Sequence, residues 1–151
     1  MGEEPGPGGP LPPEGQSTSA AGLGQRIGAR LLDVLLVGLP ASFILNQVGV
    51  GGIGSGVVLS LLWFGYFVFL ESNQGATVGK KLLKLRVAGP DGDNPPLEMA
   101  AKRNLWMLAG LIPLVGGLVS LIALVIIVVT IAQNSDNRGL HDTFAGSLVL
   151  R

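Results

Sequence analysis

Two long stretches of this chain contain no charged residue. The first covers residues 34–70. Because one membrane-spanning helix needs about 20 apolar residues, this stretch is too long for a single span. A glycine-dense segment at residues 46–56 interrupts it, and such clusters mark turns. The pattern therefore predicts a helical hairpin with spans at residues 27–47 and 53–70, the first of them kinked at Pro40.

The second uncharged stretch, residues 104–135, fits two arrangements. It forms either one long tilted span, or a short helix to about residue 111 followed by a full span that ends near residue 132. The segment Pro113 to Gly117 favours the broken arrangement, because proline and paired glycines interrupt helices. The chain is thus predicted to be an all-α polytopic membrane protein with three to four hydrophobic helical segments.

Composition supports this class. Hydrophobic residues make up 48% of the chain and charged residues only 13%, with a mean hydropathy of +0.54, whereas soluble domains carry about 25% charged residues. Residues 1–24 differ from the rest, because they are rich in proline and glycine and poor in aliphatic side chains. Such a segment buries too little apolar surface to fold. We expect a disordered tail over residues 1–24 and a transmembrane domain over residues 25–151.

The residue counts exclude several classes of function. Lys+Arg and Asp+Glu both total 10, which argues against a nucleic-acid binder that must neutralise phosphates. The chain has no cysteine, so thiol catalysis, disulfide scaffolds and thiolate metal sites are excluded. Its single histidine, His141, is too little for a histidine-rich metal centre or a convincing catalytic triad. We therefore expect neither enzymatic activity nor a metal or cofactor.

Lysine and arginine are unevenly distributed among the segments that flank the predicted spans. Two, Arg26 and Arg30, lie at the start of the first span, none lies between the first two spans, and six follow within residues 71–103. These six are Lys80, Lys81, Lys84, Arg86, Lys102 and Arg103. Because cytoplasmic loops carry the excess of positive residues, we expect a multi-pass protein of the cell membrane with a cytoplasmic N-terminus. A broken last stretch would return the C-terminus to the cytoplasm, and a single span would leave it outside.

Asp33 lies about two turns inside the first predicted span, where insertion scales assign a carboxylate a cost of about 2.5–3.5 kcal/mol. Arg26, Arg30 and Asp33 are spaced so that they share one helical face. Two interpretations remain open. Asp33 forms an ion pair with Arg30 or Arg26 near the interface, or it is a charged site inside the bundle that titrates or binds a cation.

Two further polar segments suggest function. The basic segment contains Lys80, Lys81, Lys84 and Arg86. Its positive charges suit anionic lipid headgroups or a protein partner. Cytoplasmic loops are enriched in lysine and arginine in any case, so orientation in the membrane explains these residues as well. The alternation that follows Lys84 predicts a short strand, and residues 147–150 predict another. Between the strands in sequence, His141 and Asp142 form either a proton-handling pair or part of a polar turn.

Four segments, in order along the chain, resemble the RDD family of membrane proteins. They are residues 26–33 (RIGARLLD), 75–87 (GATVGKKLLKLRV), 103–104 (RN) and 140–149 (LHDTFAGSLV). The resemblance covers about residues 24–151. The family is named for one arginine and two aspartates, which the resemblance places at Arg26, Asp33 and Asp142. Ser147 departs from the pattern, because the family usually has threonine there.

The resemblance implies a polytopic helical fold with both short strands on the cytoplasmic side, and family members have been suspected of transport. We expect transport of ions or small solutes, including cation/proton exchange, through a homo-oligomer. Asp33 and Asp142 would be its charge sites and Arg26 their counter-ion. The alternative is a non-catalytic scaffold, or an accessory subunit of a larger membrane complex, that binds a protein partner or anionic lipid through the basic segment.

Overall fold

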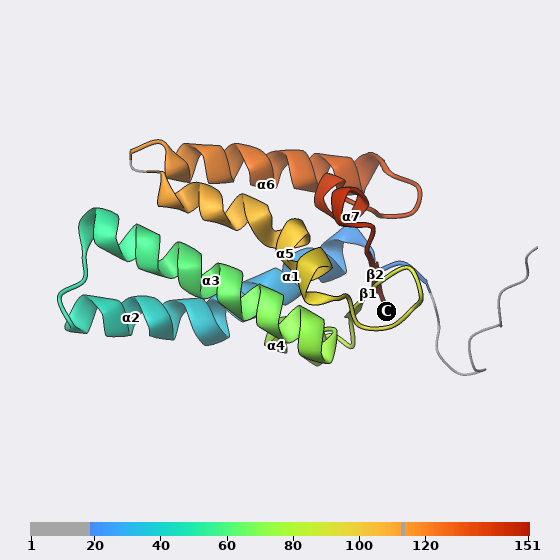
Figure 1. Cartoon of the computed structure of the whole chain (residues 1–151), viewed down its shortest axis with the longest axis horizontal. Helices are drawn as coiled ribbons and strands as arrows, with labels where there is room; N and C mark the ends of the chain where they lie inside the picture. The colour runs from blue at the N-terminus through green and yellow to red at the C-terminus, as the bar shows by residue number, and fades with distance from the viewer. Residues whose placement is uncertain (1–18, 113) are drawn as a thin grey trace, which may run out of the picture.

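The computed structural model describes residues 19–112 and 114–151. Residues 1–18 of the predicted tail lie outside this description, as does Pro113 of the predicted break. The described chain is mainly helical with one two-stranded sheet (Figure 1). Its elements are α1 (Leu23–Asp33), the π-helix η1 (Val34–Gly38), α2 (Leu39–Gln47), α3 (Gly52–Gln74), α4 (Val78–Leu82), β1 (Arg86–Ala88), α5 (Leu97–Asn104), the 3-10 helix η2 (Leu105–Leu111), α6 (Gly116–Gln133), α7 (Leu140–Ala145) and β2 (Leu148–Leu150).

Three helical stretches of the described residues are long and apolar enough to cross a membrane. They are Leu23–Gln47, which joins α1, η1 and α2 without a break, then Gly52–Gln74 and Gly116–Gln133. The predicted hairpin is present, and both of its helices begin or end several residues beyond the predicted spans. The predicted class, an all-α polytopic membrane protein with a small strand pair, is confirmed.

The uncharged stretch 104–135 is broken rather than continuous. α5 and η2 run to Leu111, the chain turns, and α6 starts at Gly116. As a result, the two helical hairpins have their connections at one end of the bundle, and the sheet, α7 and the C-terminus lie at the other (Figure 1). The start of α1 lies at this second end too, so the basic segment and both ends of the described chain share one side.

Pro40 changes the helix in an unexpected way. Proline has no backbone N–H and cannot donate to the carbonyl four residues back. The preceding turns adopt the wider π-helix η1, in which the N–H of Leu39 bonds the carbonyl of Val34, five residues away. Within η1, Gly38 lies so close to Trp63 of α3 that a Cβ would stand 2.8 Å from the indole. The disturbance at Pro40 thus coincides with a close contact between the two hairpin helices.

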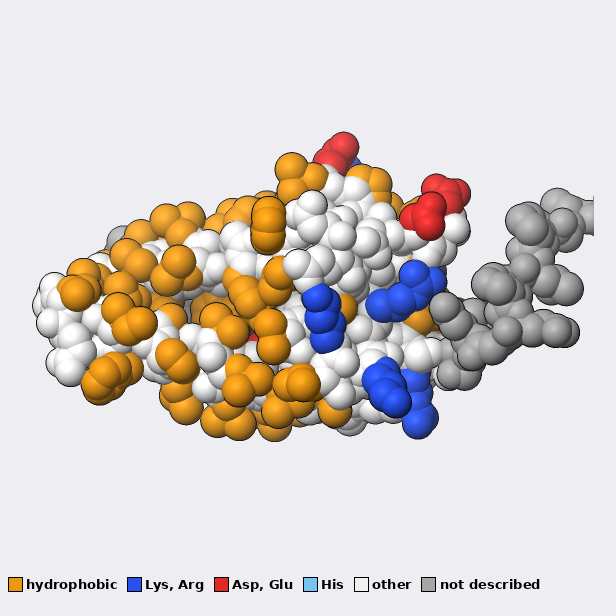
Figure 2. Space-filling model, turned by 90° about the horizontal axis from the view of Figure 1, so that it is seen from below, with side chains coloured by type: hydrophobic (Ala, Val, Ile, Leu, Met, Phe, Trp, Pro, Cys, Tyr) orange, Lys and Arg blue, Asp and Glu red, His pale blue; other side chains and the backbone are white. Residues whose placement is uncertain are grey.

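The outer surface of the helices is apolar. Phe43 of α2, Phe69 of α3 and Leu118 of α6 are each at least 60% exposed. Figure 2 shows hydrophobic side chains along the helical part of one face, while lysine, arginine and acidic side chains gather toward one end. Because soluble proteins rarely expose so continuous an apolar surface, this arrangement fits helices surrounded by lipid.

The sheet ties together three distant parts of the chain. β1 pairs antiparallel with β2, with Val87 opposite Val149, and Ala20 forms a bridge to Leu150. Both predicted strands are therefore present. Ala21, Ala29, Leu85, Val87 and Val149 form a small buried core beneath the sheet. This core anchors the start of α1 and the C-terminus to the segment that follows α4.

Candidate functional site

Asp33 is fully buried and accepts three hydrogen bonds. The hydroxyls of Tyr66 and Thr77 and the backbone N–H of Gly79 each donate to its carboxylate at 2.7 Å. The N–H can approach because Gly79 lies against α1, where a Cβ would stand 2.0 Å from the carbonyl oxygen of Ala29. Asp33 is therefore held by neutral donors from α3 and the α4 segment.

Neither arginine of α1 forms the predicted ion pair with Asp33. Arg26 reaches across to Asp142 of α7. The guanidinium of Arg30 instead lies over two aromatic rings, 4.1 Å from the centroid of Phe67 and 5.2 Å from that of Trp106. The shared helical face was predicted correctly, but tertiary contacts give its three charged residues three different environments.

Asp142 forms the second buried centre. Its carboxylate is fully buried and receives both Arg26 and Arg103, and the backbone N–H of Gly139 donates to it at 3.1 Å. Arg103 also donates to the hydroxyl of Ser147 at 2.8 Å. Burial opposes ionisation of Asp142, but the positive charges of Arg103 and Arg26 hold the pKa of this carboxyl well below its ordinary value.

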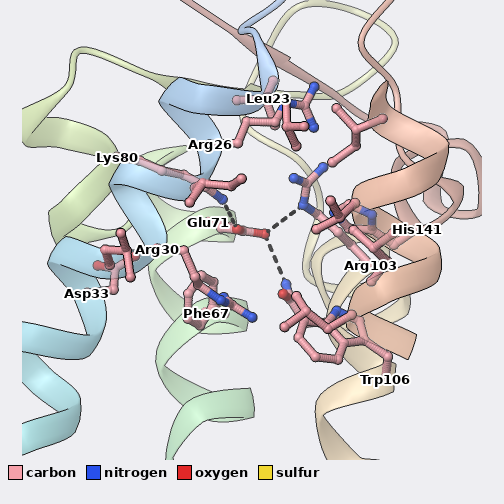
Figure 3. Close-up of a pocket in the computed structure, with 18 residues that line it drawn as sticks. Leu23, Arg26, Arg30, Asp33, Phe67, Glu71, Lys80, Arg103, Trp106 and His141 are labelled. Carbon is pink, nitrogen blue, oxygen red and sulfur yellow. Dashed lines mark hydrogen bonds and ion pairs between the residues drawn. The ribbon is translucent and has the colours of Figure 1, made fainter. Parts of the chain in front are cut away.

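Glu71 of α3 connects this centre to the basic segment. It is fully buried, pairs with Lys80, and lies 3.4 Å from Nε of Arg103. Figure 3 shows Lys80 and Arg103 on either side of Glu71. The side-chain amide of Asn104 donates at 3.0 Å to Oε2, the same oxygen that Arg103 approaches. Charged and polar residues from α1, α3, α4, α5 and α7 therefore form one connected network, from Lys80 through Glu71 and Arg103 to Asp142 and Arg26.

The four basic residues predicted to contact lipid or a partner do not act as one surface. Lys80 is buried against Glu71, so it does not lie on an exposed surface with the other three. Burial, together with the positive charge of Arg103, lowers the pKa of Lys80 to about 8 despite the opposing effect of Glu71. Lys81 and Lys84 are exposed, and Arg86 is half-buried in β1.

His141 lies beside the network without joining it as a cation. Its Nε2 is 3.4 Å from Asp142, and its Nδ1 is buried without a hydrogen-bond partner among the described residues. Burial lowers the pKa of His141 to about 3, and the positive charge of Arg103 outweighs the opposing effect of Asp142. The imidazole is therefore neutral near pH 7. Because His141 does not change its protonation state near that pH, it does not act there as half of the predicted proton-handling pair.

Several residues of the site were not predicted. Glu71 resembled the boundary of a span, and Arg103 and Asn104 resembled the start of the next one. Their roles depend on contacts between segments far apart in the sequence. No prediction was made for Tyr66. The one local signal that could have identified Glu71 was an acid placed directly at the end of a long apolar run.

A pocket of about 370 Å³ lies beside the network, between α1, α3 and α6. Its charged lining comprises Arg26, Arg30, Asp33, Glu71, Lys80 and Arg103. Its apolar walls include Leu23, Ile27 and Leu31 of α1 and Leu124, Ile127 and Ile131 of α6. No cluster of three His, Asp or Glu side chains suitable for a metal ion occurs in the part of the chain that the structure describes.

Comparison with known proteins identifies the family. The model of the RDD family matches residues 20–146. The chain belongs to the RDD family. The uncharacterized protein YckC of Bacillus subtilis (strain 168) is 31% identical to this RDD protein over 130 residues, which make up 85% of the chain and 83% of YckC. No solved structure matches the chain.

The residues that the resemblance assigned to the family name lie in two centres of this RDD protein. Arg26 and Asp142 meet in the charged network, whereas Asp33 lies in the separate centre with Tyr66, Thr77 and Gly79. The two centres meet at α4, where the backbone N–H of Gly79 donates to Asp33 and the neighbouring Lys80 pairs with Glu71. Arg26 is thus the counter-ion of Asp142 but forms no direct pair with Asp33.

Replacement of Glu71 by glutamine should strongly destabilise the protein. The change removes the negative charge between Lys80 and Arg103, and an uncompensated buried charge costs about 3–5 kcal/mol of unfolding free energy. The thermal unfolding of purified protein in detergent measures this loss. The added substitution Lys80→Gln should restore part of it.

The matched control for this experiment is Glu98→Gln. Glu98 pairs with Lys102 one turn along α5, but the Glu98 side chain is 80% exposed. The melting temperature of the Glu98→Gln protein should therefore equal that of the unsubstituted protein. Equal melting temperatures for Glu71→Gln and the unsubstituted protein would contradict the central role of Glu71.

Acidification should destabilise the protein through His141. The pKa of His141 is about 6.5 when the chain is unfolded and about 3 when it is folded, so the unfolded state binds the proton first. Stability from this group is complete above pH 6.5 and decreases as the pH falls toward 3, by about 2 kcal/mol at pH 5. Unfolding of His141→Gln, followed between pH 7 and pH 5, should depend less on pH. Parallel curves for both proteins would refute this.

Proposed function

We propose that this RDD protein is a non-catalytic membrane protein that binds an anionic ligand in the pocket between α1, α3 and α6. The observation that carries the proposal is the state of the two arginines of α1. Nη2 of Arg26 is buried without a hydrogen-bond partner among the described residues, and the Arg26 side chain is only 8% exposed. Arg30 has ring contacts and no carboxylate contact within the same part of the chain.

The balance of charge supports an anion rather than a cation. Four cationic side chains line the pocket, Arg26, Arg30, Lys80 and Arg103. Three carboxylates oppose them: Asp33 and Glu71 in the lining and Asp142 behind it. Each of the three carboxylates already accepts several hydrogen bonds or ion pairs. The remaining positive charge belongs to Arg30, whose planar guanidinium suits a phosphate or carboxylate.

We further propose that the protein lies in the cell membrane with its N-terminus, basic segment and C-terminus in the cytoplasm. Support comes from the bundle end at which Lys80, Lys81, Lys84 and Arg86 are found, because cytoplasmic loops are enriched in positive residues. A chain with three candidate spans encloses little space by itself, so we propose that it works as a homo-oligomer or as a subunit of a larger membrane complex.

A charge series tests the binding function. Hexyl phosphate, hexylphosphocholine and hexyltrimethylammonium share one tail and differ in charge. In a Trp63→Phe background, Trp106 reports on the pocket, since it lies 5.2 Å from Arg30. We expect saturable quenching or a spectral shift that is strongest for the phosphate, and an affinity about 10- to 100-fold weaker in Arg30→Gln, because a hydrogen bond to a charged group contributes about 1.5–3 kcal/mol.

Lys81→Gln is the matched control for this series. It removes an exposed positive charge from α4 outside the pocket and should leave the affinity for the phosphate unchanged. Arg30→Lys should retain part of the affinity. Equal binding of the phosphate and the ammonium compound would disprove the proposal. If only Lys81→Gln lost affinity for hexyl phosphate, the anion would bind at the basic segment and not in the pocket.

Ion transport is the second candidate, favoured by the two fully buried carboxylates inside candidate spans, Asp33 and Glu71. Cation/proton exchange predicts that Na⁺, K⁺ or Li⁺ pulses release protons from liposomes loaded with a pH-sensitive dye. The flux should disappear in Asp33→Asn and Asp142→Asn proteins of verified fold and persist in Asp91→Asn, where the acid lies in an exposed turn. If the folded protein shows no flux, ion transport is excluded and anion binding remains the proposed function.

A further inference from the structure

The pocket has charged and apolar walls along its whole length. Toward the sheet end it is lined by Arg26, Arg103 and His141, and deeper in the bundle by Arg30, by Leu31 of α1 and by Leu124 of α6. Leu31 and Leu124 are seven to eight residues from Leu23 and Ile131, the lining residues nearest the sheet end on each helix. At a rise of about 1.5 Å per residue, the pocket therefore extends about 10 Å along these helices, and Arg30 lies beside the apolar Leu31 at its deeper end.

The apolar part of the pocket reaches the lipid-facing surface. Ile27, Leu31 and Leu124 line the pocket and are nevertheless 41%, 58% and 40% exposed. These side chains belong to α1 and α6, which are both candidate membrane spans. A ligand in the bilayer can therefore reach the pocket from the side, between these two helices.

Arg30 lies in the outer third of its candidate span. It is seven residues from Leu23, which places it about 10 Å along a helical stretch of 25 residues, about 37 Å in all. The hydrocarbon core of a bilayer is about 30 Å thick, so this position lies toward the headgroup side of the span. Phe67 and Trp106 contact the flat face of its guanidinium, whereas the N–H donors point outward in the guanidinium plane.

We propose that the pocket holds an anionic phospholipid, whose phosphate contacts Arg30 and Arg26 and whose acyl chain lies between Leu31 of α1 and Leu124 and Val128 of α6. This inference rests on the proposed anion binding and names the ligand class. The positive charge of Arg30 favours an anionic headgroup. The exposed apolar residues that line the pocket on α1 and α6 favour an acyl chain beside it. A volume of about 370 Å³ is at the lower end for ligand pockets, which suits a headgroup and part of one chain, with the remainder in the bilayer.

Lipids with brominated acyl chains test the proposal, because bromine quenches tryptophan fluorescence on contact. The full chain carrying Trp63→Phe is placed in vesicles of unbrominated phosphatidylcholine with a minor fraction of brominated phosphatidylglycerol or brominated phosphatidylcholine. We expect brominated phosphatidylglycerol to quench Trp106 at about 10-fold lower mole fraction than brominated phosphatidylcholine. Arg30→Gln should remove this preference, and Lys81→Gln should retain it.

A second variant tests the chain separately from the headgroup. Val128→Phe enlarges a half-buried pocket wall and should reduce quenching by brominated phosphatidylglycerol, while its melting temperature reports whether the fold is intact. If folded Val128→Phe protein were still quenched preferentially and equally strongly by brominated phosphatidylglycerol, the proposed position of the acyl chain would be wrong. Equal quenching by the two brominated lipids would overturn the proposal of a lipid.

The charge series with hexyl compounds distinguishes the two ways of failing. Preferential binding of hexyl phosphate together with equal quenching by both brominated lipids would leave a soluble anion as the ligand and the binding function intact. Absence of any charge preference in both experiments would overturn the inference and the proposed function together.

Discussion

Burial of charge is the constraint on which the rest of this structure depends. Asp33, Glu71 and Asp142 are fully buried in a bundle whose outer surface is apolar, and an unpaired ion in such a place would cost several kcal/mol. Each carboxylate must therefore be met by donors from other segments. The helix ends, the small sheet and α4 bring those donors within reach, which explains why so many short elements gather at one end of the bundle.

The two centres solve this problem differently. Asp33 is satisfied by neutral donors, two hydroxyls and a backbone N–H, and that arrangement needs the close approach of Gly79 to α1. Glu71 and Asp142 instead share Arg103, which contacts both. Because Arg103 links them, a change at either acid should affect the other, and the network should respond to substitution as one unit.

The arginines of α1 connect this structural role to the proposed ligand binding. Arg26 contributes to the network through Asp142, yet one of its nitrogens faces no acceptor among the described residues. Arg30 is positioned by aromatic rings instead of by an acid. A site that fixes a cation without neutralising it remains attractive to an anion, and its place between two lipid-facing helices determines which anions can reach it.

Hydropathy determined the class of this protein and, with the glycine cluster, its hairpin, and alternation indicated two short strands. The length of an apolar run and the alternation of a strand are local properties, whereas the pairing of these strands joins segments about 60 residues apart. The break after residue 111 was also visible in the local sequence. Only the tertiary structure decided the partners of the charges. Arg26, Arg30 and Asp33 share a helical face, but Asp142 is more than 100 residues away from Arg26 in the sequence and adjacent in space. Pairing of buried ions is set by how helices pack, which spacing within one helix does not encode.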